Sequence, residues 1–286
     1  MELITSKRNK AKIKLAIQGA SGSGKTYSSL LLAKGLSNND FSKVVVIDTE
    51  GGSSNLYAHL GEFRVLSLKP PYSPDNYIKA IDTCIEAGME IIILDSISQC
   101  WTYLLNFHSK MTGNSFTNWK KVTEKQDNFI NKILQSPVHI IATMRAKQAY
   151  VLNLKDGKYV PEKIGLKAIQ RNDIDFEFTV VFNLDNTNNV TVMKDRTILF
   201  SKPNKFKINA TTGQKIYNWC EFNESDLKLI KEEIEACESV ASLKRLYSKY
   251  STLKHELEPL ILEKKSRLEN VQINGVSSKK TSSSKA

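Results

Sequence analysis

The stretch Gly19-Ala20-Ser21-Gly22-Ser23-Gly24-Lys25-Thr26 decides the fold of this chain. It has the pattern GxxxxGK followed by Ser or Thr, in which glycines let backbone amides turn towards phosphate oxygens. An apolar run, Ile13–Ile17, precedes it, and a helix-like stretch, Lys25–Leu36, follows it and would add a favourable N-terminal dipole. We therefore expect Lys25 to reach the β- and γ-phosphates of a nucleotide and Thr26 to ligate Mg²⁺.

Further apolar runs recur along the chain and predict strands. They are Val44–Ile47, Ile91–Leu94 and Ile140–Ala142, with a fifth, β-prone run at Phe176–Phe182. Helix-like stretches lie between them, at Pro74–Ala87 and about 118–134. Nearly continuous apolar strands are buried on both faces, so this alternation predicts an α/β fold with a mostly parallel twisted sheet flanked by helices. The carboxyl ends of such strands share one edge, where ligands bind.

Acidic residues stand where two of these strands are expected to end. Asp95 follows Ile91–Leu94 and is a candidate for the carboxylate that holds Mg²⁺ from its second coordination shell beside the phosphate loop, with a helix N-cap as the alternative. Asp48 and Glu50 follow Val44–Ile47, and a carboxylate there can polarise the water that attacks a γ-phosphate. Glu50 is the candidate, with Asp48 or a merely solvated acid as alternatives. Tyr27, next to the phosphate motif, is a candidate for stacking on the adenine.

The composition is that of a globular protein, with 41% hydrophobic and 25% charged residues, which excludes a largely disordered chain. No apolar run is long enough to predict a membrane span, and the N-terminus lacks the apolar segment of a signal peptide. The four cysteines are far apart and form no CxxC pair, so a zinc site has little support. We therefore expect reduced cysteines in a cytosolic compartment.

The net charge of +11 is concentrated in three places. Residues 1–14 hold five basic side chains and one acid, and residues 271–286 hold three lysines and no acid. Residues 145–171 hold seven basic side chains and two acids. Basic ends are often no more than solvated tails. The internal segment therefore carries the stronger indication of a polyanionic partner.

Composition and the spacing of apolar residues divide the chain into three parts. Residues 1–222 are expected to form an ATPase-type core, with a basic N-terminal segment at 1–12. Leucine and isoleucine stripes at helical spacing predict a small helical appendage at 223–270. Residues 271–286 lack aromatic residues and are rich in Ser and Lys, so disorder is expected there.

The strings GASGSGKT, IDTEGG and IIILDS, in this order and spacing, resemble the RecA-type recombinase core. The closer similarity is to phage and prophage RecA-like ATPases, some of which are single-strand annealing or recombination proteins. Members carry segments similar to HIIATMRAKQAY, to Gln170–Phe182 and to VTVMKDRT, so the resemblance covers roughly residues 10–220. It implies a RecA-like P-loop NTPase fold that uses ATP and Mg²⁺ in the cytoplasm of a bacterial host, and it places the catalytic glutamate of that superfamily at Glu50.

The resemblance also assigns roles to three cations. Arg145 lies just after Ile140–Thr143, where RecA-type cores place a γ-phosphate sensor that is commonly glutamine, so Arg145 is expected either to sense phosphate or to contact DNA. Lys194 and Arg196 resemble the K-x-R element that related ring ATPases and helicases insert into the neighbouring subunit's site; solvated turn charges are the alternative. If they act there, the active site forms only between subunits, which implies a homo-oligomeric filament or ring.

The basic segment at 145–171 follows the sensor strand, where RecA-type proteins carry a mobile DNA-binding loop. Cations that hold phosphates and rings that stack on bases suit single-stranded DNA. The candidate DNA-binding residues are Lys147, Tyr150, Lys155, Lys158, Tyr159 and Lys163. The aromatic and basic stretch after Asp95, from Trp101 to Lys121, is a second candidate loop.

Other classes of P-loop protein fit less well or cannot be separated. A GTP switch needs a guanine-reading NKxD, and the nearest string, Asn131–Leu134, lacks the acid. A small-molecule kinase would not need the KDR element or a basic loop. A helicase or packaging motor shares the ATPase core and the K-x-R element, so it stays an alternative. A non-catalytic binding or loading protein has no use for a water-activating acid such as Glu50. We therefore expect an ATP-hydrolysing, single-stranded-DNA-binding recombination or annealing protein with no membrane association, with phage recombination or replication proteins as further candidate partners.

Overall fold

The structure is a computed structural model that describes residues 11–155, 158–200 and 205–280. It describes no side chains for residues 148–159, 161–166, 224, 255 and 271–280. The chain divides into two compact units, one spanning Lys12–Tyr217 and the other beginning at Asn218. This division lies a few residues before the boundary expected at 222. Nearly all of the predicted basic segment 1–12 lies outside the described residues.

The first unit is built on one mixed sheet with the strand order β3-β2-β4-β5-β1-β7-β8-β9, in which β6 pairs only with β5. The pairs among β1 to β5 and β7 are parallel, whereas β8 and β9 are antiparallel to their neighbours. The strands are β1 (Lys14–Gly19), β2 (Val44–Asp48), β3 (Arg64–Ser67), β4 (Ile91–Asp95), β5 (His139–Lys155), β6 (Lys158–Ala168), β7 (Val180–Leu184), β8 (Asn189–Asp195) and β9 (Phe206–Lys207).

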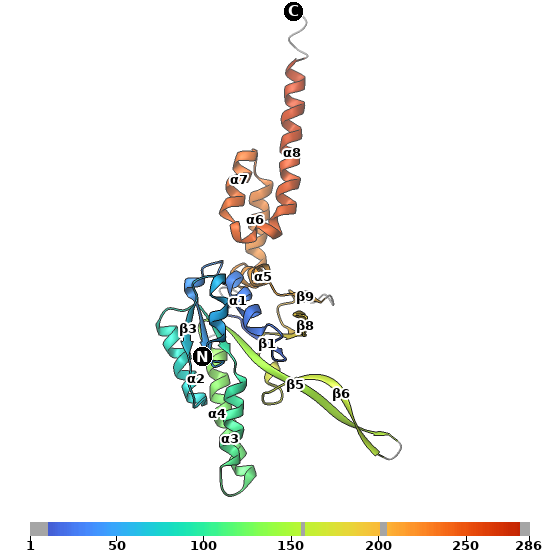
Figure 1. Ribbon diagram of the computed structural model, residues 1–286. Coiled ribbons are helices and arrows are strands. Elements are labelled where there is room, and N and C mark those ends of the chain that lie inside the picture. Colours follow the sequence, from blue (N-terminus) through green and yellow to red (C-terminus); the bar gives the residue numbers. More distant parts are fainter. Residues whose placement is uncertain (1–10, 156–157, 201–204, 281–286) are drawn as a thin grey trace, which may run out of the picture. The chain divides into compact units, whose positions relative to one another are not determined.

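Helices cover both faces of this sheet, so every residue of the central strands β1, β2 and β4 is buried (Figure 1). On one face, Val45, Ile47 and Ile92 pack against side chains of α2 and α4, among them Tyr77 and Phe129. Helix α1 lies against β1, β4 and β5. The helices of the unit are α1 (Lys25–Leu36), α2 (Pro74–Glu86), α3 (Ser98–Ser109), α4 (Ser115–Gln135) and α5 (Ala210–Glu221). The predicted α/β fold is confirmed.

Helix α5 packs on α1 with almost no space between the two backbones. A Cβ atom added to Gly35 would lie 1.8 Å from the carbonyl oxygen of Ala210, and one added to Gly213 would lie 2.1 Å from that of Leu32. A larger residue at either position would force the helices apart. Because α1 begins at the phosphate loop, this packing anchors the helix whose N-terminus forms part of the candidate site.

Two predicted features differ from the structure. The basic segment 145–171, expected as a mobile loop, is mostly an antiparallel hairpin in which β5 continues beyond the sheet and pairs with β6 (Figure 1). The predicted strand Phe176–Phe182 begins only at Val180, because residues 174–176 form a turn of 3-10 helix. Local β-propensity did not detect that turn, which Asp173 opens with a φ of 67°.

The second unit contains α6 (Glu224–Glu235), α7 (Val240–Lys249) and α8 (Lys254–Lys280). Ile230, Ile234, Leu243, Leu253 and Leu257 form its apolar core, in line with the predicted stripes. Helix α8 runs to Lys280, into the segment 271–286 that was expected to be disordered. Within the described residues, no helix is both long and apolar enough to cross a membrane.

Candidate active site

The phosphate motif forms the turn between β1 and α1, at the edge where the parallel strands end. Gly22 and Gly24 have φ values of 80° and 81°. Residues with a Cβ atom are strained in this left-handed region, whereas glycine adopts it readily. Gly19 has no room for a side chain, since a Cβ atom there would lie 2.4 Å from the Ser23 hydroxyl. Backbone amides at the N-terminus of α1 thus remain available for an anion.

Lys25 is held inside this loop. Its ammonium donates hydrogen bonds to the carbonyl oxygens of Gly19, at 3.1 Å, and Ala20, at 2.7 Å. Burial lowers the pKa of Lys25, while the carboxylates of Asp95 and Glu50 act in the opposite direction. A phosphate group would supply the full counter-charge that this partly desolvated ammonium lacks.

Asp95 joins the phosphate loop to the sheet. One of its carboxylate oxygens accepts a hydrogen bond from the Thr26 hydroxyl at 2.6 Å, and the other accepts one from the Thr143 hydroxyl at 2.6 Å. Burial raises the pKa of Asp95, and these two hydrogen bonds oppose the shift. The alternative role as a helix cap does not apply, because α3 has Ile97 at its N-cap and no side-chain cap.

The turn after β2 gives its two acids different surroundings. The Asp48 carboxylate accepts hydrogen bonds from the backbone amides of Glu50, Gly52 and Ser54 and from the Ser54 hydroxyl. Asp48 is therefore occupied in holding the turn in shape. The Glu50 side chain is only partly buried and points instead towards the Ser96 hydroxyl, 3.0 Å away.

Glu50 also pairs with Arg145, which lies within β5 where that strand leaves the sheet and continues as the hairpin. The guanidinium donates from Nε to one carboxylate oxygen at 2.9 Å and from a terminal nitrogen to the other, which makes a two-point ion pair. Arg145 is the last residue of β5 in register with β1, and its carbonyl accepts from Ile169 at the foot of the hairpin. Arg145 thus links Glu50, the candidate general base, to the hairpin.

The turn between β7 and β8 supports the phosphate loop and was not predicted from the sequence. Asn188 donates from its side-chain amide to the carbonyl oxygen of Ser23 at 2.9 Å. The same amide lies 2.6 Å from the position a Cβ atom would take on Gly24. Asp185 holds the turn by accepting from Thr187 and Asn189, which lowers its pKa to about 2.

Tyr27 lies partly exposed at the start of α1, next to a second aromatic residue that sequence patterns did not single out. Its ring is 5.3 Å from that of Tyr57, at an angle of 57°. Tyr57 belongs to the 3-10 segment Ser53–Leu60, which follows the turn that carries Glu50. The two rings therefore bring an aromatic surface to the neighbourhood of the phosphate loop, as a stacked base requires.

Lys194 and Arg196 lie far from the phosphate loop of their own chain. Asp195 pairs with Val180, at the edge where the parallel strands begin, whereas Gly19 lies where they end. Lys194 donates to the carbonyl oxygen of Phe176, and Arg196 reaches the same atom at 3.3 Å. These two cations therefore cannot reach the phosphate loop of their own chain.

The candidate DNA-binding side chains follow the β5–β6 hairpin. Lys147 is exposed, and the structure describes the backbones but not the side chains of the other predicted residues, Tyr150, Lys155, Lys158, Tyr159 and Lys163. The register places Lys147 opposite Lys167 and Lys155 opposite Lys158. Like charges directly opposite each other destabilise a strand pair unless an anion joins them.

The second candidate loop is a helical hairpin, α3–α4, and most of its rings contact one another. His108 stacks on Trp119 with ring centroids 4.1 Å apart, and Trp101 lies 6.4 Å from Trp119. Phe116 is 87% exposed near the start of α4. Trp101 and Trp119 therefore have ring partners within the chain. Of the aromatic residues of this helical hairpin named here, Phe116 is the most exposed to an external partner.

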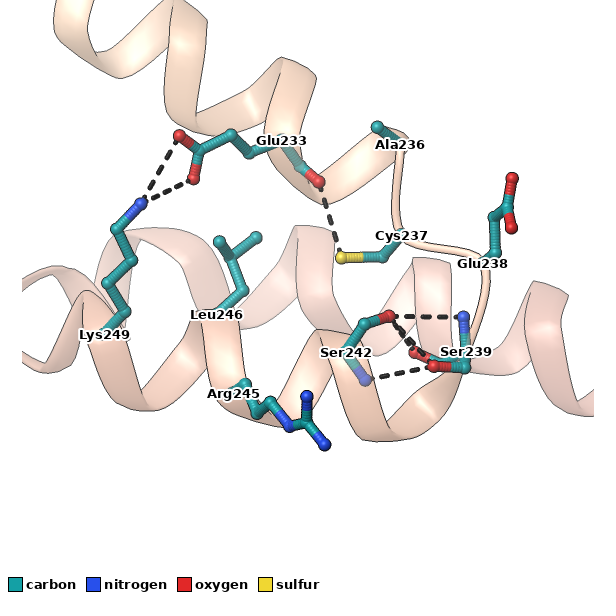
Figure 2. Close-up of a pocket in the computed structure, with 9 residues that line it drawn as sticks. All are labelled: Glu233, Ala236, Cys237, Glu238, Ser239, Ser242, Arg245, Leu246 and Lys249. Atoms are coloured by element: carbon teal, nitrogen blue, oxygen red, sulfur yellow. Dashed lines mark hydrogen bonds and ion pairs between the residues drawn. The ribbon is translucent and has the colours of Figure 1, made fainter.

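An open cavity of about 780 Å³ lies in the C-terminal unit, and Figure 2 shows its lining. Glu233 pairs there with Lys249, and the thiol of Cys237 faces the carbonyl oxygen of Glu233 at 3.4 Å. Ser239 and Ser242 cap α7 reciprocally. These polar groups satisfy one another, so the cavity has the character of a surface groove in a helical bundle.

Comparison with known proteins assigns the first unit to a family of domains. A family model described as an AAA domain matches residues 11–208. The matched segment begins just before β1 and ends just after β9, so it covers nearly the whole sheet. Comparison with curated proteins finds none that matches the chain.

Proposed function

The chain belongs to the AAA-domain family of P-loop ATPases, and we propose that it hydrolyses ATP to drive the handling of single-stranded DNA in phage-type recombination or annealing. The observation that carries the hydrolytic part is the contact between Thr26 and Asp95. It joins a phosphate loop to a buried carboxylate at 2.6 Å. This is the arrangement that P-loop NTPases use to hold a phosphate-bound metal ion.

The oxygen atoms of Thr26 and Asp95 suit Mg²⁺. Within the described residues no cluster of three or more His, Cys, Asp or Glu could hold a metal by itself. Mg²⁺ does not need one, because it commonly takes one or two protein oxygens together with phosphate oxygens and water. When bound, the ion would neutralise charge on the β- and γ-phosphates. The raised pKa of Asp95 supports the same assignment, since a buried carboxylate without a cation beside it is costly.

Glu50 is our candidate for the residue that orients the attacking water. Its carboxylate is paired with Arg145, so it can accept a proton from water only after that guanidinium moves. A γ-phosphate would compete for Arg145, because a phosphate group carries more negative charge than a carboxylate. In this proposal Arg145 senses the γ-phosphate and, by leaving Glu50, frees the base.

Single-stranded DNA is proposed as the partner of the β5–β6 hairpin. The seven basic residues of 145–171 include two pairs of lysines at opposite register positions of β5 and β6. A chain of phosphates along the hairpin would relieve their repulsion and release counterions. Because Arg145 lies at the foot of the hairpin and on Glu50, an occupied hairpin would also influence hydrolysis.

We further propose that Lys194 and Arg196 act on the phosphate site of a neighbouring copy. Their distance from their own phosphate loop supports this, as does the cationic pair they form next to the exposed ring of Phe176. The active assembly would then be a homo-oligomer, a ring or a filament, with ATP between subunits.

The test compares ATP binding and turnover in the wild type, Lys25→Ala and Glu50→Gln. We expect Lys25→Ala to lose nucleotide binding. Glu50→Gln should retain binding and lose turnover by about 100-fold or more, as expected for a general base. A Glu50→Gln protein that hydrolyses ATP at the wild-type rate would remove Glu50 from the mechanism.

A further inference from the structure

A cavity of about 430 Å³ lies at the foot of the β5–β6 hairpin. Its walls come from the ends of β1 and β6, from the segment after β6, and from β8. The lining includes Gln18, Lys167, Arg171, Asp173, Phe176 and Met193. Lys25, Asp95 and Glu50 do not line this cavity, although Gln18 directly precedes Gly19 of the phosphate loop.

One wall of the cavity carries the side-chain amide of Gln18. Gln18 is only 8% exposed, and no hydrogen bond joins its side chain to another described residue. An amide that lines a cavity without a partner in the described chain is available to hydrogen-bond a ligand.

The walls combine apolar surface with charge. Phe176 is 62% exposed and Met193 is 55% exposed, although both are large apolar side chains. The ammonium of Lys194 lies 6.0 Å above the Phe176 ring, and Arg196 contacts the backbone of the same residue. Lys167, on the hairpin itself, has no ionic partner among the described residues. An aromatic ring, a side-chain amide and cations at the rim are groups that bind single-stranded nucleic acids.

We propose that this cavity binds one unstacked base of a single-stranded nucleic acid, with Gln18 hydrogen-bonded to the edge of the base and Phe176 stacked on its ring. This inference rests on the proposed function and adds a base-binding site to it. Amides present both a donor and an acceptor, as base edges do. The acid Asp173 at the wall can accept a hydrogen bond from an N–H group of the base.

The position of the cavity favours a base of a bound strand over a free small molecule. Lys167 lines the cavity and also lies near the end of β6, at the foot of the lysine-rich hairpin. A strand held by its phosphates along β5 and β6 would pass this opening. A second copy of the chain could bury Phe176 and Met193, but it would have to bring its own polar groups to Gln18, and this becomes an outcome of the test.

The experiment measures affinity by fluorescence anisotropy for two labelled oligonucleotides of equal length, one of thymidines and one in which every base is missing. We expect the wild type to bind the base-containing strand more tightly. Gln18→Leu and Phe176→Ala should each lose about 10-fold for that strand and keep their affinity for the abasic one, because one stacked base contributes about that much. Leu229→Ala, which removes a similarly exposed apolar side chain from α6, is the matched control.

Thermal unfolding separates a binding role from a structural one. Gln18→Leu replaces an amide that has no hydrogen-bond partner among the described residues, so its unfolding midpoint should equal or exceed that of the wild type even though binding weakens. If the wild type prefers the base-containing strand and both variants keep that preference, the cavity does not bind a base and the proposed function stands. If Phe176→Ala instead weakens self-association with base preference intact, a second copy covers the cavity. If the wild type binds neither strand, the proposed DNA function fails as well.

Discussion

The buried Asp95 carboxylate accepts hydrogen bonds from two threonine hydroxyls, and its burial has opposite consequences for stability and for function. Burial raises its pKa above that of an unfolded aspartate, so its ionised form at neutral pH lowers the free energy of unfolding. Asp95→Asn removes that charge and should raise the unfolding midpoint at pH 7.5 without Mg²⁺. The gain should vanish as the pH falls and Asp95 becomes protonated in both states.

The same substitution should abolish Mg²⁺-dependent ATP binding, since it removes the carboxylate proposed for the metal site. Calorimetric titration with and without Mg²⁺ measures this, and Thr143→Val, which loses a hydrogen bond but no ligand, is the control. A lower midpoint for Asp95→Asn at neutral pH would show that its hydrogen bonds outweigh the cost of burying the charge.

Asn188 is the residue whose role is the least visible in the sequence. It contacts Ser23 from 165 positions away, so no local pattern links the two. Asn188→Ala should raise the KM for ATP several-fold with little change in kcat, since it loosens the phosphate loop without touching the reacting atoms. Asn188→Asp should do more, because it adds a negative charge beside the phosphates.

Asn39→Ala is the matched control for this prediction. Asn39 also has a positive φ, 66°, and lies in an exposed turn after α1, so the backbone cost of alanine is comparable. Equal KM values for Asn188→Ala and the wild type would mean that the β7–β8 turn does not set the geometry of the phosphate loop.

At the scale of single elements, the phosphate loop and the central strands were predictable, because GASGSGKT and the runs at 44–47 and 91–94 carry local signals. The choice between Asp48 and Glu50 was not, since both follow the same strand and only the hydrogen bonds of the turn separate them. The hairpin was also missed. Its basic residues suggested a loop, whereas the pairing of Ala146 with Ala168 depends on contacts distant in sequence.

The hairpin yields a prediction about salt. Replacing Lys155, Lys158 and Lys163 with alanine should weaken binding of single-stranded DNA and lower the slope of log affinity against log salt by about 2, if all three contact phosphates. Alanine at Lys79, Lys231 and Lys244 removes the same charge from exposed positions elsewhere and should leave the slope unchanged. An identical slope for the two triple variants would rule the hairpin out as a phosphate contact.

For the whole molecule, the separation between the phosphate loop and the Lys194–Arg196 pair predicts shared active sites. Arg196→Ala and Glu50→Gln should each be inactive alone, and mixing them should restore part of the activity, because one interface in the mixture has both intact groups. The measurement is ATP turnover against mixing ratio at high protein concentration. A mixture that stays inactive at every ratio would confine Lys194 and Arg196 to a role within their own chain.

The coupling of hydrolysis to DNA is tested by one titration, in which steady-state ATP turnover by the wild type is followed as single-stranded DNA is added. We predict a rise in turnover that saturates with the strand, that is absent in Lys25→Ala, and that needs higher DNA concentrations when the hairpin lysines are replaced. Turnover that is unaffected by single-stranded DNA at any concentration, in a wild-type protein that hydrolyses ATP, would contradict the proposed link between the hairpin, Arg145 and Glu50.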